Sequence, residues 1–273
     1  IHFIEHEVGG PAYLVGHSLG GYLSLMAASR RPDLASGLVM LDSPVLSGWK
    51  ARAVQVAKAA GIGERFSPGH VSKRRRQQWD SADAAFAHFS AKPAFARWAP
   101  GMLRDYIASG TETHGKQRRL SFHRDVETAI YNALPHHLAR VLRAHPLQCQ
   151  MAFIRGTEST EIRQVGMRAT ERLAQGRISS IEGSHLYPLE RPAETAAEVQ
   201  AIVAALRGGE DSLLTLTGPG GVGKTSLALA VSEAASEFFG GETAFVPLAS
   251  IADSSHIAAE VAAAHRLLDA WSA

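Results

Sequence analysis

The sequence is short of several features that would restrict its function. It contains one cysteine, Cys149, so no intrachain disulfide can form, and a reducing, cytoplasmic location is expected. No apolar run reaches the roughly eighteen residues of a transmembrane helix. The charges nearly cancel, at a formal net charge of +2, so we expect neither membrane nor direct nucleic-acid binding.

The first residues also lack a targeting segment. IHFIEHEVGG has neither the basic leader nor the apolar core of a signal peptide. It does not begin with methionine, and we expect it to be an internal part of a longer protein.

Short apolar runs alternate with helical patterns along most of the chain. A predicted strand at 12–15 is followed by a helix at 22–29 and a strand at 38–41. The alternation resumes later, with predicted strands at 148–154 and 177–181 and helices at 161–173 and 192–206. Between these parts, residues 45–145 favour helices and show no clear strand. The pattern predicts an α/β fold with a parallel sheet and a helical insertion.

The first predicted strand runs into Gly16-His17-Ser18-Leu19-Gly20, which fits G-x-S-x-G. Such a turn from strand to helix places the serine hydroxyl above the sheet, and its glycines relieve steric crowding. The motif predicts Ser18 as a nucleophile. It also predicts that the backbone N–H of Leu19, at the start of the helix, stabilises an oxyanion.

A serine nucleophile needs a base, and His185 is the best candidate among 13 histidines. His185 follows a predicted strand within a Gly-Ser loop, late in the chain, as the order Ser, acid, His requires. The rival histidines all lie within the helical insertion; they are His70, His114, His123, His136 and His137.

The acid that would orient His185 has three candidates. Asp42 ends the strand after the nucleophile helix, whereas Glu158 and Glu161 follow the strand at 148–154. Asp42 could instead cap the turn that begins at Ser43-Pro44.

Several segments together resemble the α/β-hydrolase superfamily, in its capped, esterase-like branch. They are LVGHSLGG, LVMLDSP, FIRGTES and IEGSHLYPLERP, and they occur in family order. The resemblance implies a Ser-His-acid triad and a cap, at about 45–145, that sets substrate choice. In that family the acid usually follows the strand corresponding to 148–154, where this chain has no aspartate. In some members it ends the preceding strand, so Asp42 is our choice.

The resemblance also implies several strands before the nucleophile strand, and this sequence does not contain them. One of their loops normally supplies a second oxyanion N–H. We therefore expect residues 1–206 to be a hydrolase domain without its first strands, from a fragment or from a gene model begun too late.

A second kind of motif follows a polar linker at 207–211. After a predicted strand at 213–216, GPGGVGKT fits G-x-x-x-x-G-K-[ST], a loop whose N–H groups wrap phosphates. The predicted nucleotide-binding residues are Gly218, Gly220, Gly221, Gly223, Lys224 and Thr225, with Thr225 also holding Mg²⁺.

The segment 212–264 resembles the start of a signalling ATPase found in large bacterial transcriptional regulators. We expect 212–273 to be a partial P-loop ATPase unit that binds ATP and Mg²⁺. No acidic residue on a following apolar strand supports hydrolysis of ATP.

These observations predict a serine hydrolase that acts on carboxylic esters. Its expected partners are a small-molecule ester as substrate and a nucleotide at the phosphate loop. No cofactor is expected in the hydrolase part. The alternative is a non-catalytic module that senses a small molecule in an ATP-dependent transcriptional regulator. A third hypothesis is that the chain is an accidental join of two incomplete genes.

Overall fold

The computed structural model describes residues 1–59, 69–133, 137–207 and 214–217 of the 273. A five-stranded parallel sheet in the order β7-β6-β2-β1-β8 forms its centre. The strands are β1 (Ala12–His17), β2 (Ala35–Leu41), β6 (Gln150–Gly156), β7 (Ile178–Ile181) and β8 (Leu214–Thr217). No helix in the described ranges has the length and apolar character needed to cross a membrane.

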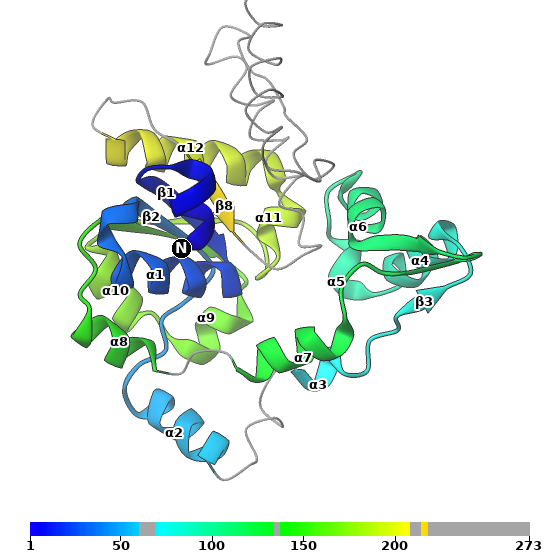
Figure 1. Ribbon diagram of the computed structural model, residues 1–273, viewed down its shortest axis with the longest axis horizontal. Helices are drawn as coiled ribbons and strands as arrows, with labels where there is room; N and C mark the ends of the chain where they lie inside the picture. Colours follow the sequence, from blue (N-terminus) through cyan, green and yellow to red (C-terminus); the bar gives the residue numbers. More distant parts are fainter. Residues whose placement is uncertain (60–68, 134–136, 208–213, 218–273) are drawn as a thin grey trace, which may run out of the picture.

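Helices cover both faces of this sheet (Figure 1). One apolar cluster joins Leu14 and Phe153 of the sheet to Leu25 of α1, and a second joins Val15 and Ile154 to α12. Alternate strand residues therefore face opposite layers, as the pleat requires. The flanking elements are η1 (Ile4–Val8), α1 (Leu19–Arg30), η2 (Pro32–Leu34), α8 (Leu138–Ala144), α9 (Thr160–Val165), α10 (Arg168–Ala174), α11 (Tyr187–Glu190) and α12 (Pro192–Arg207).

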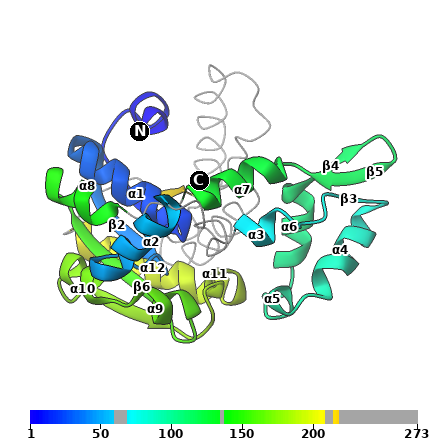
Figure 2. The same cartoon turned by 90° about the horizontal axis from the view of Figure 1, so that it is seen from below.

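Residues 69–132 of the insertion form a separate cap beside the sheet, as two views at right angles show (Figure 2), whereas residues 48–59 and α8 lie with the sheet and its helices. The apolar core of the cap contains Trp79, Phe89 and Ile107, of which Trp79 is 1% exposed. The elements from 48 to 132 are α2 (Gly48–Ala59), α3 (Gly69–Ser72), β3 (Gln78–Trp79), α4 (Ala82–Ser90), α5 (Pro93–Ala96), α6 (Met102–Gly110), β4 (Thr111–His114), β5 (Gln117–Leu120) and α7 (Arg124–Asn132).

The prediction of an insertion without strands is wrong. β3, β5 and β4 form a small antiparallel sheet, and β4 and β5 make a hairpin around Gly115, whose φ is 61°. These strands have two to four residues and carry mostly polar side chains, so they show no apolar alternation. Glu112 lies opposite Arg119, and the two form an ion pair across the hairpin.

Two other predicted elements differ in detail. The predicted helix at 161–173 is broken into α9 and α10 at Gly166, which has φ 85°. The strand expected at 213–216 occurs at 214–217 and pairs with β1 at the edge of the same sheet. The phosphate loop that was predicted to follow it lies outside the described residues.

Gly156, at the end of β6, lies too close to another segment to carry a side chain. A Cβ there would lie 2.5 Å from the backbone oxygen of Ser184 and 2.8 Å from that of Gly183. We expect Gly156→Ala to lower the free energy of unfolding by about 1 to 3 kcal/mol, because backbone must move to relieve the clash.

Urea unfolding would measure this change, with Gly10→Ala as the control. Nothing lies within 4 Å of a Cβ built at Gly10, so we expect a change below about 0.5 kcal/mol there. Equal losses in the two variants would contradict the predicted clash.

Candidate active site

Ser18 occupies a sharp turn between β1 and α1. Its φ of 54° and ψ of −119° are unfavourable for a residue with a side chain. The turn brings Gly16 against Gly20 so closely that a Cβ on Gly16 would lie 2.3 Å from the carbonyl carbon of Gly20. The backbone N–H of Ser18 donates to the carbonyl of Leu41 at 3.1 Å, which ties the turn to β2.

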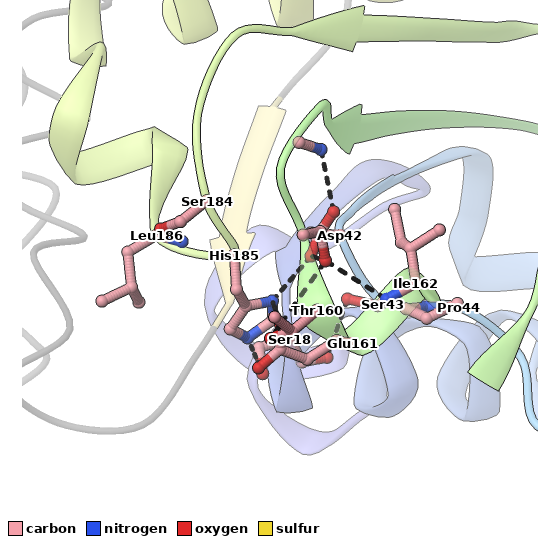
Figure 3. Close-up of polar contacts among 12 residues, drawn as sticks. Ser18, Asp42, Ser43, Pro44, Thr160, Glu161, Ile162, Ser184, His185 and Leu186 are labelled. Carbon is pink, nitrogen blue, oxygen red and sulfur yellow. Dashed lines mark hydrogen bonds and ion pairs between the residues drawn. The ribbon is translucent and has the colours of Figure 1, made fainter. Parts of the chain in front are cut away.

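The structure brings the three residues predicted as a triad together. His185 lies between Asp42 and Ser18, as Figure 3 shows. Its Nε2 is 3.0 Å from Ser18 Oγ, and its Nδ1 is 2.7 Å from Asp42 Oδ2. These contacts form one continuous hydrogen-bonded line from carboxylate to hydroxyl.

The Asp42 carboxylate is buried, at 1% exposure, and is held by donors from three segments. The N–H of Gly156 donates to Oδ1 at 2.8 Å. The Ser159 hydroxyl donates to Oδ2 at 2.5 Å, the same oxygen that contacts His185. A buried carboxylate needs such partners, and here they leave one oxygen aimed at the imidazole.

The two alternative acids occupy different positions. Glu158 pairs with Arg97 of the cap at 2.6 Å, and this hydrogen bond lowers the pKa of the Glu158 carboxyl below its ordinary value. Glu161 Oε2 lies 3.9 Å from His185 Nδ1, beyond hydrogen-bond distance. Of the three candidates, Asp42 alone makes a hydrogen bond to His185.

Among the rival histidines, those whose side chains the structure describes do not reach this site. His114 ends β4 and His123 precedes α7, both on the surface of the cap, while His137 precedes α8. The side chain of His70 and all of His136 lie outside the described residues.

Sequence reasoning missed His17, which contacts His185 directly. Its Nε2 lies 2.7 Å from the backbone oxygen of His185, and the two rings are tilted by 36° with centroids 4.7 Å apart. Burial lowers the pKa of His17 to about 3, and the neighbouring His185 adds to this effect. A neutral His17 can donate its Nε2 proton to that carbonyl, so it holds the backbone of His185. The sequence feature that points to His17 is its position directly before Ser18 in the motif.

Leu19 lies where the sequence predicted it, as the first residue of α1. A residue at this position has a backbone N–H with no acceptor inside its own helix. The N–H and the positive end of the helix dipole therefore lie directly after Ser18 in the chain.

Two groups of side chains in the described ranges have metal-ligand types within 4.8 Å of one another. His2, Glu5 and His6 are exposed, and Glu5 is hydrogen-bonded to Arg31. Asp42, Glu161 and His185 form the other group, but the Asp42 carboxylate already accepts three hydrogen bonds. The second group therefore fits a hydrogen-bonded triad better than a metal centre.

A family model matches most of the chain. Residues 1–198 match the model of the Alpha/beta hydrolase family. This match ends before the predicted phosphate loop.

Two relatives match over short segments. Pheophytinase, chloroplastic, from Arabidopsis thaliana is 36% identical over 57 residues, covering 21% of this chain and 12% of that protein. Lipase LipV from Mycobacterium tuberculosis is 40% identical over 58 residues, covering 21% of this chain and 22% of that protein. The chain thus matches less than a quarter of either relative's length.

A solved structure shows the fold more broadly. The crystal structure of E-2-(acetamidomethylene)succinate hydrolase superposes with a TM-score of 0.57 at 21% identity, covering 76% of this chain and 70% of that one.

The low pKa of His17 predicts a pH-dependent stability. The unfolded chain binds a proton at this residue below about pH 6.5, whereas the folded chain stays neutral down to about pH 3. Acidification therefore favours the unfolded state, and stability is lost as the pH falls from about 6.5 toward 3. We expect this residue to contribute a loss of about 1 to 2 kcal/mol between pH 7 and pH 5.

Urea unfolding at the two pH values, in the wild type and in His17→Gln, measures that contribution. Glutamine keeps an N–H donor but does not titrate, so the variant should lose less stability on acidification. Identical losses in both proteins would show that His17 is protonated normally in the folded state.

Proposed function

The chain belongs to the alpha/beta hydrolase family, and on that premise we propose that it is a serine hydrolase that cleaves carboxylic esters. The observation that carries the proposal is the hydrogen-bonded line Asp42–His185–Ser18 at 2.7 and 3.0 Å. Matching residue types and distances recur in serine hydrolases of unrelated folds, because the chemistry requires them.

The proposed reaction begins with attack of Ser18 Oγ on the ester carbonyl carbon. His185 Nε2 takes the hydroxyl proton, and the Asp42 carboxylate stabilises the resulting imidazolium through Nδ1. The oxyanion faces the N–H of Leu19. The tetrahedral intermediate collapses, and the alkoxide leaves with the proton from His185. Water then attacks the acyl-enzyme by the same route, which releases the acid and regenerates Ser18.

Ester cleavage is favoured over amide cleavage by the local likeness to a protein named as a lipase. The fold itself does not choose among acyl substrates. We assign substrate choice to the cap, which lies beside the sheet and contacts the segment that carries His185: the N–H of Ala99 donates to the carbonyl of Leu189 at 2.9 Å.

The alternative function is a small-molecule sensor within an ATP-dependent regulator. It rests on the motif at 218–225, which lies outside the described residues. A sensor would need a pocket but no activated serine, so the labelling experiment below separates the two functions.

A fluorophosphonate should label Ser18, because the neighbouring imidazole activates its hydroxyl. Peptide mass spectrometry would locate the label. We expect Ser18→Ala to abolish it and His185→Ala to slow it by at least about a hundredfold. His123→Ala, on the cap surface, serves as the control and should label at the wild-type rate. An unlabelled wild-type protein would overturn the hydrolase proposal and favour the sensor.

The identity of the acid can be tested by comparing Asp42→Asn with Glu161→Gln. Asp42 makes the direct contact with His185, so Asp42→Asn should lower kcat for a p-nitrophenyl ester about a thousandfold or more. Glu161 is 42% exposed and 3.9 Å away, so Glu161→Gln should lower kcat less than about threefold. The reverse order of effects would make Glu161 the acid.

A further inference from the structure

A second buried carboxylate lies behind His185, and the proposed reaction does not use it. Glu190, the last residue of α11, has a side chain that is 6% exposed. Its Oε1 accepts a hydrogen bond from the Ser184 hydroxyl at 2.5 Å, and its Oε2 accepts one from the backbone N–H of Ser184 at 3.0 Å. Both oxygens thus hold the residue directly before His185.

The segment 182–186, here called the histidine loop, depends on these contacts for its shape. The Ser184 hydroxyl also accepts the N–H of Leu186 at 3.0 Å, so it bridges the two residues on either side of His185. Gly183 has φ 148°, and a Cβ there would lie 2.7 Å from Glu190 Oε2. The glycine therefore lets the carboxylate approach the loop backbone.

The charge of Glu190 is balanced by a residue of the cap. Arg97, immediately after α5, places one guanidinium nitrogen 3.2 Å from Glu190 Oε2 and the other 2.6 Å from Glu158 Oε2. A planar guanidinium can serve two carboxylates in this way, whereas an ammonium group would serve them less well. Arg97 thus joins the cap to the segments that follow β6 and β7.

We propose that Glu190 and Arg97 are positioning residues that fix the histidine loop, so that the docked cap determines how well His185 is aligned with Ser18. This inference rests on the proposed function for the catalytic role of His185. Loss of Arg97 would leave the Glu190 carboxylate buried without its cationic partner, a costly state that the loop can relieve only by moving.

The first test compares Arg97→Ala with Arg119→Ala. Both remove a cap arginine of similar exposure, 45% and 43%, from an ion pair, but Arg119 pairs with Glu112 within the cap. Hydrogen exchange of a peptide spanning 183–190 should be at least about tenfold faster in Arg97→Ala and unchanged in Arg119→Ala. Equal exchange in the two variants would overturn the proposal.

The second test uses kinetics with a short p-nitrophenyl ester. We expect Arg97→Ala to lower kcat about tenfold with little change in KM, and Arg97→Lys to recover part of the loss. Glu190→Gln should lower kcat more than Arg97→Ala does. The double variant should have nearly the same kcat as Glu190→Gln, because both residues act through Ser184. Additive losses, or an effect on KM alone, would count against the proposal.

Failure of this proposal and failure of the proposed function can be distinguished. A wild-type protein that neither cleaves esters nor reacts with a fluorophosphonate would refute the proposed function. The exchange comparison would still decide whether Arg97 and Glu190 order the histidine loop.

Discussion

The burial of the Asp42 carboxylate is the constraint on which the site depends. At 1% exposure this charge has to be matched by hydrogen-bond donors, and they come from the end of β6, from the residue before α9 and from the loop after β7. A parallel sheet makes this convergence natural, because the carboxyl ends of β2, β6 and β7 meet at one edge. The same edge carries the turn at Ser18. The register of the sheet therefore sets the distance between the acid and the nucleophile.

Ser43 couples that acid to the nucleophile turn. Its hydroxyl contacts the carbonyls of both Ser18 and Leu41 at 2.9 Å, directly after Asp42 in the chain. Ser18 and Asp42 both have positive φ, at 54° and 47°, so the site holds two unfavourable backbone conformations side by side. Their cost is offset by the packing of the buried strands around them. Mutual support of this kind holds the hydroxyl, the imidazole and the carboxylate in line.

The parts of this arrangement that could be predicted are local ones. The turn at Ser18 follows from five consecutive residues, and His185 from its place after a strand. Asp42 could be preferred over Glu158 and Glu161 only through a family resemblance, because spacing along the chain does not say which carboxylate meets the imidazole. His17 and Ser159 were missed because their roles arise from contacts between distant segments. Glu190 was missed because its contact with nearby Ser184 depends on how the loop folds back on α11. The cap strands were missed because they are short and polar, so no apolar period marks them.

Two buried carboxylates thus flank His185 with different effects. Asp42 contacts the imidazole ring and sets which nitrogen carries the proton, whereas Glu190 contacts the preceding residue and sets where the ring stands. His17 adds a third restraint, on the carbonyl of His185 itself. The cap has an apolar core of its own, so its residues can change without disturbing the sheet. Arg97 differs from them, because its guanidinium reaches out of the cap to the carboxylate behind the proposed base. The requirement to neutralise Glu190 therefore ties the segment that we assign to substrate choice to the segment that holds His185.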